Sequence, residues 1–416
     1  MPRRLCSASR HGMAFALLCA GHGAALAQNA DGSNATATIS DDLPRPGYEP
    51  RNLRIGAATL AGQIGFETRY DSNVFAVSVN PLSDVIFIIT PRVAIDGVGD
   101  RLKYHGEVFA DIREYAEQSS ESHTTFGAAG SAGYTFSQNH RLAGGARFER
   151  LAETRNDPEA NTNLGLPPRL LDFVGGNLEY GYQAGRFGLE LRGAATHLGY
   201  LAPEDAERSL ASYNLAVRAT LVATPVLALF IQPYVNRRNF DQAFDDSGID
   251  RDMTTLGIIG GARLTTTDRW SGEIGIGAFN ANPDDASLRS FSGFAASANI
   301  AWSPSRRTTV TLKGASGDTA TVRAGAIGRS DSSINLRIDQ EVRHNLRFTA
   351  TIGYQKTNYT GLPNELRTVF GSAQVEYLMN RVVSLFVTGN YAERRANPTT
   401  DNFDRGYIGI GIRLRH

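Results

Sequence analysis

Apolar and polar side chains alternate with a period of two along most of the chain after residue 55. Residues 187–196 read Phe-Gly-Leu-Glu-Leu-Arg-Gly-Ala-Ala-Thr, and the pattern recurs over 213–221, 334–343 and 346–355. Successive side chains of a β-strand point to opposite faces, so each segment predicts a strand with one apolar and one polar face. About 18 such segments, within a range of 16 to 18, predict an all-β protein.

The connections between these segments alternate in length. Short links lie at 97–100, 137–140, 183–186, 303–306, 343–345 and 379–381, and longer polar stretches at 71–83, 116–122, 152–170, 200–208, 241–252 and 318–330. Short periplasmic turns that alternate with longer outer loops are typical of barrels in the bacterial outer membrane. We therefore expect one closed antiparallel transmembrane β-barrel over 55–416. Its strands follow an up-and-down meander, and both termini lie in the periplasm.

A soluble propeller or sandwich would show the same alternation, but three features favour a barrel in lipid. Trp270 and Trp302 fall on the apolar face beside short turns, where an aromatic girdle lies at the membrane interface. Aromatic residues at the loop ends indicate a second girdle: Tyr70, Tyr200, Phe291, Tyr359 and Tyr391. The apolar face is also rich in Gly and Ala, which lipid tolerates better than a packed core does.

The N-terminal residues have the composition of an export signal. Arg3, Arg4 and Arg10 precede a short apolar run, and an Ala-x-Ala site ends at Ala27. This order predicts a signal peptide over 1–27, cleaved on export from a Gram-negative cytoplasm. Residues 28–54 are rich in Asn, Asp, Thr and Pro, and we expect a disordered periplasmic leader there.

Composition removes several classes of function. Lys+Arg and Asp+Glu each number 42, and removing the three arginines of the signal peptide leaves a formal charge of −3. A nucleic-acid-binding protein would need a basic excess. Both cysteines, Cys6 and Cys19, leave with the signal peptide, which excludes thiol catalysis and disulfides from the mature chain. No later segment has about 18 uninterrupted apolar residues, so a membrane-spanning helix is not expected. We expect no cofactor and no metal.

The polar face of the strands would line the lumen of the barrel. The candidate pore-lining residues are its charged side chains: Glu67, Arg69, Arg92, Lys103, Glu107, Arg113, Arg147, Glu149, Glu190, Arg192, Arg218, Arg263, Glu273, Arg337, Asp339, Glu341, Arg343 and Glu376, together with Asp111, Arg141 and Lys313. A barrel of this size leaves an aqueous channel, and rings of charge inside a pore set its preference among solutes. The modest basic excess predicts a passive channel that weakly prefers anions or acidic saccharides. The alternative is a lumen filled by paired charges, in a non-conducting scaffold barrel.

The sequence gives weaker support to two other kinds of site, a metal-binding loop and a hydrolase active site. Asp241, Asp245, Asp246, Asp250 and Asp252 crowd one loop, and Asp284 and Asp285 lie in another. Their spacing lacks the order of an EF-hand loop, so we expect solvated loop charges. An outer-membrane hydrolase would need a nucleophile and a histidine near the outer rim. His105 on the inner face and His123 near an outer loop are the remaining candidates, and neither lies in a nucleophile motif. The sequence therefore predicts a protein that is not an enzyme.

The last strand carries the pattern by which outer-membrane barrels are recognised for assembly. Tyr407, Ile408, Ile410, Ile412, Leu414 and His416 make up this segment. It resembles the C-terminal signal read by the barrel assembly machinery, which usually ends in an aromatic residue, most often Phe. His416 takes that place here. The resemblance implies this machinery as a partner, alongside the lipid bilayer.

Residues 43–96 resemble one family of outer-membrane β-barrel porins. Leu43-Pro-Arg-Pro-Gly-Tyr-Glu-Pro50 leads to the first strand, which is followed by Tyr70-Asp-Ser-Asn-Val-Phe75, Ser83-Asp84 and Thr90-Pro-Arg92. This succession is similar to the porins associated with exopolysaccharide biosynthesis and export clusters in Proteobacteria. The resemblance implies an outer-membrane location and a role linked to polysaccharide export, with export components as further partners. It carries over no catalytic residues.

Overall fold

The protein is described here from a computed structural model, which covers residues 45–160, 166–264 and 269–416. Strands account for most of these residues. The strands are β1 Leu53–Ile55, β2 Ala58–Asp71, β3 Asp84–Val98, β4 Leu102–Tyr115, β5 His123–Thr135, β6 His140–Ala152, β7 Leu170–Ala184, β8 Phe187–Tyr200, β9 Leu210–Thr224, β10 Leu227–Phe240, β11 Met253–Leu264, β12 Trp270–Pro283, β13 Phe291–Ser305, β14 Thr308–Thr319, β15 Gly328–Arg343, β16 Leu346–Thr360, β17 Glu365–Leu378, β18 Val383–Asn397 and β19 Phe403–Arg415. Short 3-10 helices lie in loops at Ser119–Glu121, Pro203–Arg208 and Thr399–Asp401. In this part of the chain no helix has the length and apolar character needed to cross a membrane.

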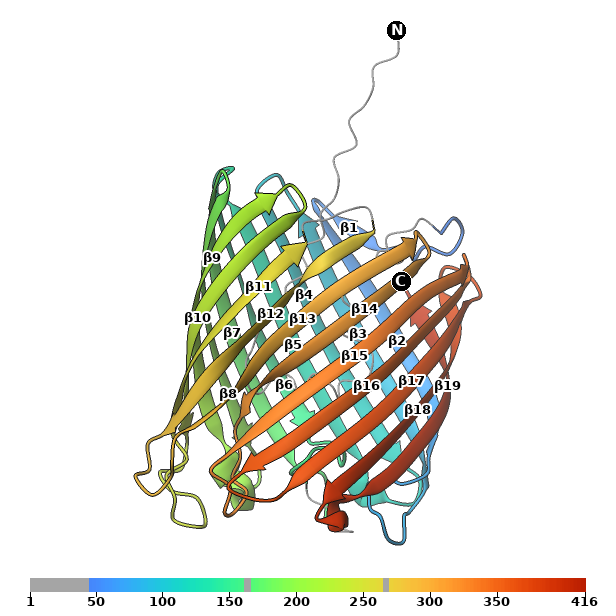
Figure 1. Cartoon of the computed structure of the whole chain (residues 1–416). Coiled ribbons are helices and arrows are strands. Elements are labelled where there is room, and N and C mark those ends of the chain that lie inside the picture. Colours follow the sequence, from blue (N-terminus) through green and yellow to red (C-terminus); the bar gives the residue numbers. More distant parts are fainter. Residues whose placement is uncertain (1–44, 161–165, 265–268) are drawn as a thin grey trace.

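The sheet closes on itself as a barrel (Figure 1). Each strand from β2 to β19 pairs antiparallel with the next one in the chain, and β19 pairs antiparallel with β2, with Ile408 opposite Tyr70. The result is a closed barrel of 18 strands with β1 as one extra strand, which confirms the predicted meander. Closure leaves no unpaired edge among these strands, as a sheet in lipid requires because no water is present there to bond free N–H and C=O groups.

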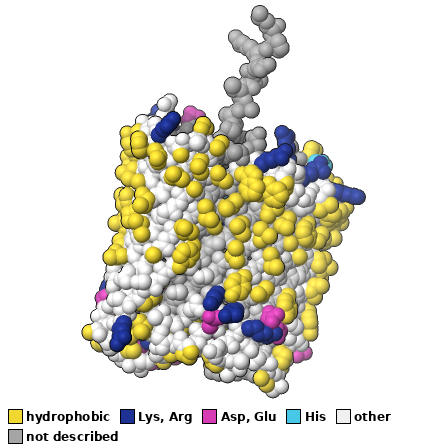
Figure 2. All heavy atoms as spheres, in the orientation of Figure 1, with side chains coloured by type: hydrophobic (Ala, Val, Ile, Leu, Met, Phe, Trp, Pro, Cys, Tyr) yellow, Lys and Arg dark blue, Asp and Glu magenta, His cyan; other side chains and the backbone are white. Residues whose placement is uncertain are grey.

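The two faces of the strands differ as the alternation predicts. On β8, the Leu189 and Leu191 side chains are 48% and 46% exposed, whereas Glu190 between them is 9% exposed. Ile410 on β19 is 65% exposed, and apolar side chains spread over the outer surface in Figure 2. Because an exposed apolar surface of this extent is stable only against lipid, the outer face is the membrane face and the charged face lines the interior.

One of the two expected aromatic girdles needs correction. Trp270 and Trp302 pair across β12 and β13 on the outer face, with ring centroids 5.5 Å apart, as expected. Tyr70 and Tyr391 at the loop end also point outward. The predicted placement of three others in this girdle is wrong, because they point inward: Tyr200, Phe291 and Tyr359. Tyr200 has the parity of Glu190 on β8, and Tyr359 has the parity of Arg347 on β16, so the alternation itself placed these two on the inner face.

The short turns and the chain end share one end of the barrel (Figure 1). Arg415 is the last residue of β19, and the His416 backbone N–H donates to the Gly62 carbonyl at 2.8 Å. The predicted signal peptide and most of the predicted leader lie outside the described residues. The last two residues of the predicted leader, Leu53 and Arg54, are not disordered but form β1 together with Ile55, with Leu53 opposite Leu60 of β2.

Candidate functional site

The charged inner wall is the candidate site. The expected pore-lining residues lie on strands. Lys313 is an exposed residue of β14, and all but two of the others form ion pairs. Examples are Arg92 with Glu107 at 2.9 Å and Arg337 with Asp339 at 2.8 Å. The exceptions among the described residues are Lys103 and Arg343, which are exposed beside short turns.

A continuous ladder of ion pairs covers the inner face from β6 to β12. At its β12 end, the Glu273 carboxylate lies 2.9 Å from both Arg218 and Arg263. Arg218 is only 1% exposed and also donates to Gln232 at 2.7 Å. The members of this wall ladder are Arg141, Glu179, Glu190, Arg192, Arg218, Arg263 and Glu273. With four arginines and three glutamates, the ladder carries a small positive excess.

The loop that joins β6 to β7 folds into the barrel. The described part of this crossing loop, residues 153–160 and 166–169, contacts strands on the opposite side of the barrel. The Glu159 carboxylate lies 3.7 Å from Arg329 of β15 and accepts from Thr321 at 2.6 Å. Arg405 of β19 donates to Asn156 at 3.1 Å. In the closed order of 18 strands, β15 lies about half the circumference from β6, so the loop spans the lumen and narrows it.

Arg394 is a buried anchor of the crossing loop. This β18 side chain is 4% exposed and donates to the backbone carbonyls of Asn156 and Asp157. Its guanidinium also lies over the Phe403 ring at 4.8 Å and donates to Thr368 at 3.2 Å. A buried cation held by carbonyls and a ring fixes the loop backbone, because its removal would leave those carbonyls without a donor.

On its own side of the barrel, the crossing loop is held around Glu153. Arg208 donates to this carboxylate at 2.7 Å and Arg169 at 3.1 Å. Burial raises the pKa of Glu153, although the two arginines oppose that shift. Arg155 pairs with Glu121, and both side chains are buried. These contacts fix the loop inside the barrel.

The acidic loops are not uniformly solvated, which corrects the expectation for Asp245. This carboxylate is 8% exposed, lies 2.6 Å from Arg251, and accepts N–H bonds from Ser247 and Ile249. Burial tends to raise its pKa, but these donors together hold the pKa below the usual value. Arg251 in turn donates to the Ala326 carbonyl at 2.5 Å. The β10–β11 loop is thereby tied to the β14–β15 loop.

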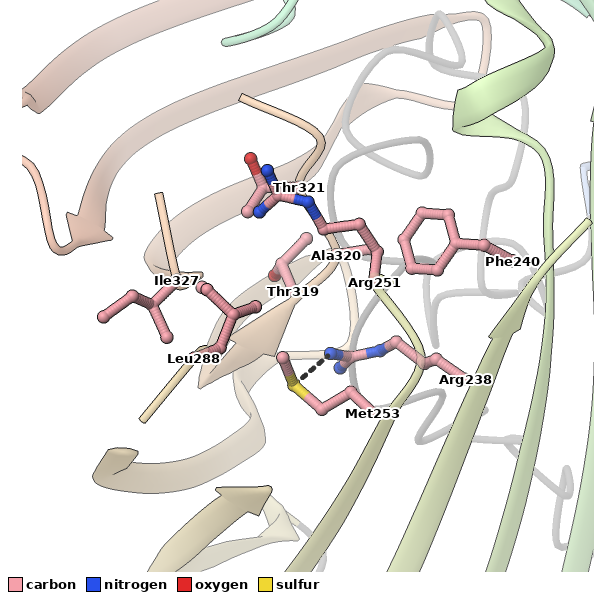
Figure 3. Close-up of a pocket in the computed structure, with 10 residues that line it drawn as sticks. Arg238, Phe240, Arg251, Met253, Leu288, Thr319, Ala320, Thr321 and Ile327 are labelled. Atoms are coloured by element: carbon pink, nitrogen blue, oxygen red, sulfur yellow. Dashed lines mark hydrogen bonds between the residues drawn. The ribbon is translucent and has the colours of Figure 1, made fainter. Parts of the chain in front are cut away.

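A small cavity lies between these two loops (Figure 3). The Arg238 guanidinium approaches the Met253 sulfur at 3.8 Å, and Arg238 pairs with Asp318 at 2.6 Å. The cavity has a volume of about 10 Å³, which is close to the minimum that holds one water. It is a packing space rather than a ligand pocket.

Sequence reasoning did not single out the anchors of the crossing loop. Arg329, Arg394 and Arg405 have the parity of the inner face on their strands, so the alternation could have found them. The inward fold of the described loop residues, 153–160 and 166–169, had no comparable signal. A polar sequence of that length is equally compatible with a loop that extends into solvent, because the residues that bind it lie far away in the sequence.

The histidines considered for catalysis have ordinary partners. His105 lies 2.8 Å from Asp96 on the adjacent strand. The His123 ring contacts the Glu121 carbonyl at 2.6 Å, and the neighbouring Ser122 hydroxyl accepts from the Tyr115 N–H. These contacts are consistent with structural roles. In the last strand, Ile408 and Ile410 point outward, while Tyr407 lies under Arg69 on the inner face at 4.2 Å.

Comparison with known families and structures adds the following. The family model described as "Putative beta-barrel porin 2" matches residues 45–416. No curated protein matches the sequence. Similar solved structures include the siderophore receptor PirA from Pseudomonas aeruginosa (8% identity, TM-score 0.42, covering 86% of this chain and 80% of that one). OccAB3 from Acinetobacter baumannii has 9% identity and a TM-score of 0.43, with 87% and 100% covered. OmpT of Vibrio cholerae has 15% identity and a TM-score of 0.33, with 88% and 100% covered. The structural scores are too low to bear on function.

Proposed function

Because the chain belongs to this family of outer-membrane β-barrel porins, we propose that it is a passive channel for small hydrophilic solutes, including saccharides. The observation that supports this most directly is the charged inner wall inside a closed 18-strand barrel. Barrels of 16 to 18 strands are wide enough to hold an aqueous channel. In this proposal the protein is not an enzyme, and both termini lie in the periplasm.

The charges of the wall would give the channel a weak preference for anions or acidic saccharides. Each acidic member of the wall ladder is matched by at least one arginine, and one arginine remains in excess. A pore whose lining has a positive excess attracts anions into its interior. The crossing loop would limit the size of the solutes that can pass, because it spans the lumen near the long-loop end of the barrel.

Planar-bilayer recording of the purified barrel tests this function. We expect stepwise single-channel currents and a reversal potential that indicates weak anion preference in a salt gradient. Strongly cation-selective currents would contradict the anion preference. If the barrel resists denaturation by detergent, which shows that it is folded, but passes no current, the proposed channel function is contradicted.

A second candidate function is a non-conducting scaffold barrel in a polysaccharide secretion system. The observation that favours it is the set of contacts that the crossing loop makes across the lumen, with Arg329, Arg394 and Arg405 as partners. The resemblance of residues 43–96 to porins of exopolysaccharide clusters supports a link to export in either case. Deletion of the gene followed by measurement of secreted polysaccharide tests that link, and unchanged secretion would contradict it.

A further inference from the structure

The inner face at the short-turn end of the barrel carries a dense group of arginines. This basic cluster consists of Arg45, Arg307, Arg347, Arg413 and Arg415, with Glu341 and Glu376 as its carboxylates. Arg45 reaches across from the segment before β1 and lies 3.0 Å from Glu341 of β15. The cluster therefore brings together both ends of the described chain and the wall from β15 to β19.

The two carboxylates of the basic cluster are already engaged. Glu376 lies 2.9 Å from Arg413 and 3.6 Å from Arg347, and it accepts a hydrogen bond from Ser384 at 2.8 Å. Glu341 is shared by Arg45, Arg307 and His344. Five arginines against two glutamates leave a net charge of +3, whereas the wall ladder has four arginines against three glutamates.

Arg415 is the one arginine of the basic cluster that forms no ion pair with either carboxylate. Among the described residues its side chain has no ion pair and no hydrogen bond, although its Nε and Nη2 atoms are shielded from solvent. It lies within electrostatic range of the Glu376 carboxylate and of three other cations, Arg45, Arg347 and Arg413. Buried N–H donors without acceptors are costly, and a cation among other cations is more so. Such an arrangement is relieved by an anion.

The two free atoms also define the shape of the missing partner. Nε and Nη2 lie on one edge of the planar guanidinium, and their N–H groups point in parallel. That edge binds two oxygens of one carboxylate or phosphate in a bidentate manner, which a lysine ammonium cannot reproduce. The neighbouring Arg413 is held over the Phe386 ring at 5.0 Å and by Glu376, so the surroundings of this edge are fixed before a ligand arrives.

We propose that Arg415 anchors a binding site for an oxyanion, a carboxylate or phosphate group, at the short-turn end of the lumen, with Arg45, Arg347 and Arg413 supplying the surrounding positive charge. The site differs from the wall ladder because its principal arginine forms no ion pair with a carboxylate of the described residues. It does not depend on conduction, since an anion could bind there in an open channel or in a scaffold barrel.

Calorimetric titration of the barrel, purified in detergent from outer membranes, tests the site. The probes are inorganic phosphate and D-glucuronate, which separate phosphate from carboxylate recognition. We expect at least one probe to bind the wild-type chain and to bind Arg415→Gln about tenfold more weakly. The affinity of Arg415→Lys should lie between those of the wild type and Arg415→Gln, because lysine keeps the positive charge but cannot donate two parallel hydrogen bonds.

Arg381→Gln is the matched control, because Arg381 is an exposed arginine in a turn at the same end of the barrel. It should bind the probe as the wild type does. Equal affinity in Arg415→Gln and wild type would overturn the proposal, and so would the absence of binding of both probes to the wild-type barrel. Detergent-resistant migration on gels verifies that each variant is folded. Loss of current in bilayers would bear on the proposed channel but not on this binding result.

Discussion

The wall ladder and the crossing loop both place charged residues inside the barrel, but they are held in different ways. The ladder joins strands that lie two or three positions apart in the sheet, as when Glu190 on β8 pairs with Arg141 of β6 and Arg263 of β11. The crossing loop is held by partners such as Arg394, which is 237 residues away from Asp157 in the chain. Loss of a ladder charge should change which ions enter, whereas loss of a loop anchor should change how much space they have.

Removing the crossing loop should have the largest effect. Replacement of residues 155–167 by a short Gly-Ser linker removes the segment that reaches Arg329, Arg394 and Arg405. We expect single-channel conductance to rise severalfold, because the obstruction leaves the lumen. Replacement of 284–287 in an exposed loop is the control and should leave conductance unchanged. Unchanged conductance in the first variant would mean that the loop does not limit the passage.

Loss of one anchor should have a smaller effect than loss of the loop. Arg394→Met removes the donor to the carbonyls of Asn156 and Asp157, which should weaken docking of the loop by about 1–3 kcal/mol. We expect noisier currents and faster proteolysis within the loop. Arg395→Met is the matched control, because that side chain is 57% exposed on the outer face. Equal behaviour of the two variants would contradict the anchoring role.

A ladder variant should change selectivity more than conductance. Glu273→Gln leaves Arg218 and Arg263 without their shared carboxylate and adds one positive charge to the wall. We expect the reversal potential in a salt gradient to shift toward stronger anion preference, with a current amplitude close to that of the wild type. Glu204→Gln, in an exposed outer loop, should shift it little. A shift toward cations would show that the ladder does not line the conducting path.

The smallest expected effect is a pH dependence of the crossing loop. Burial raises the pKa of Glu153, so the folded loop binds a proton more tightly than the undocked loop does. The stabilisation that this group contributes is therefore present at low pH and is lost as pH rises through the raised pKa. We expect fewer loop-dependent current fluctuations at pH 5 than at pH 7, and no such difference in Glu153→Gln. More fluctuations at pH 5 in the wild type would contradict this sign.

The difference between ladder and loop also explains what could be predicted. Glu190 and Arg192 were assigned to the inner face from parity alone, because a strand fixes the direction of every second side chain. The same rule covers Arg394, which sequence reasoning passed over, and it shows why Tyr200 and Tyr359 point inward. The rule does not apply to Asp245, because side chains in a loop do not alternate between two faces. The burial of Asp245 depends instead on Arg251 and on backbone donors.

The barrel, its lipid-facing and charged faces, and the approximate number of strands could all be predicted from the amino-acid sequence. These properties follow from the local periodicity of apolar and polar residues and from the length of each connection, and both can be read directly from the sequence. The sequence alone does not indicate which charges pair, that the loop after β6 crosses the lumen, or that Arg415 forms no ion pair within the described part of the chain, and these properties follow from the folded structure. Closure of the sheet brings residues hundreds of positions apart within a few ångströms, and nothing local records those distances.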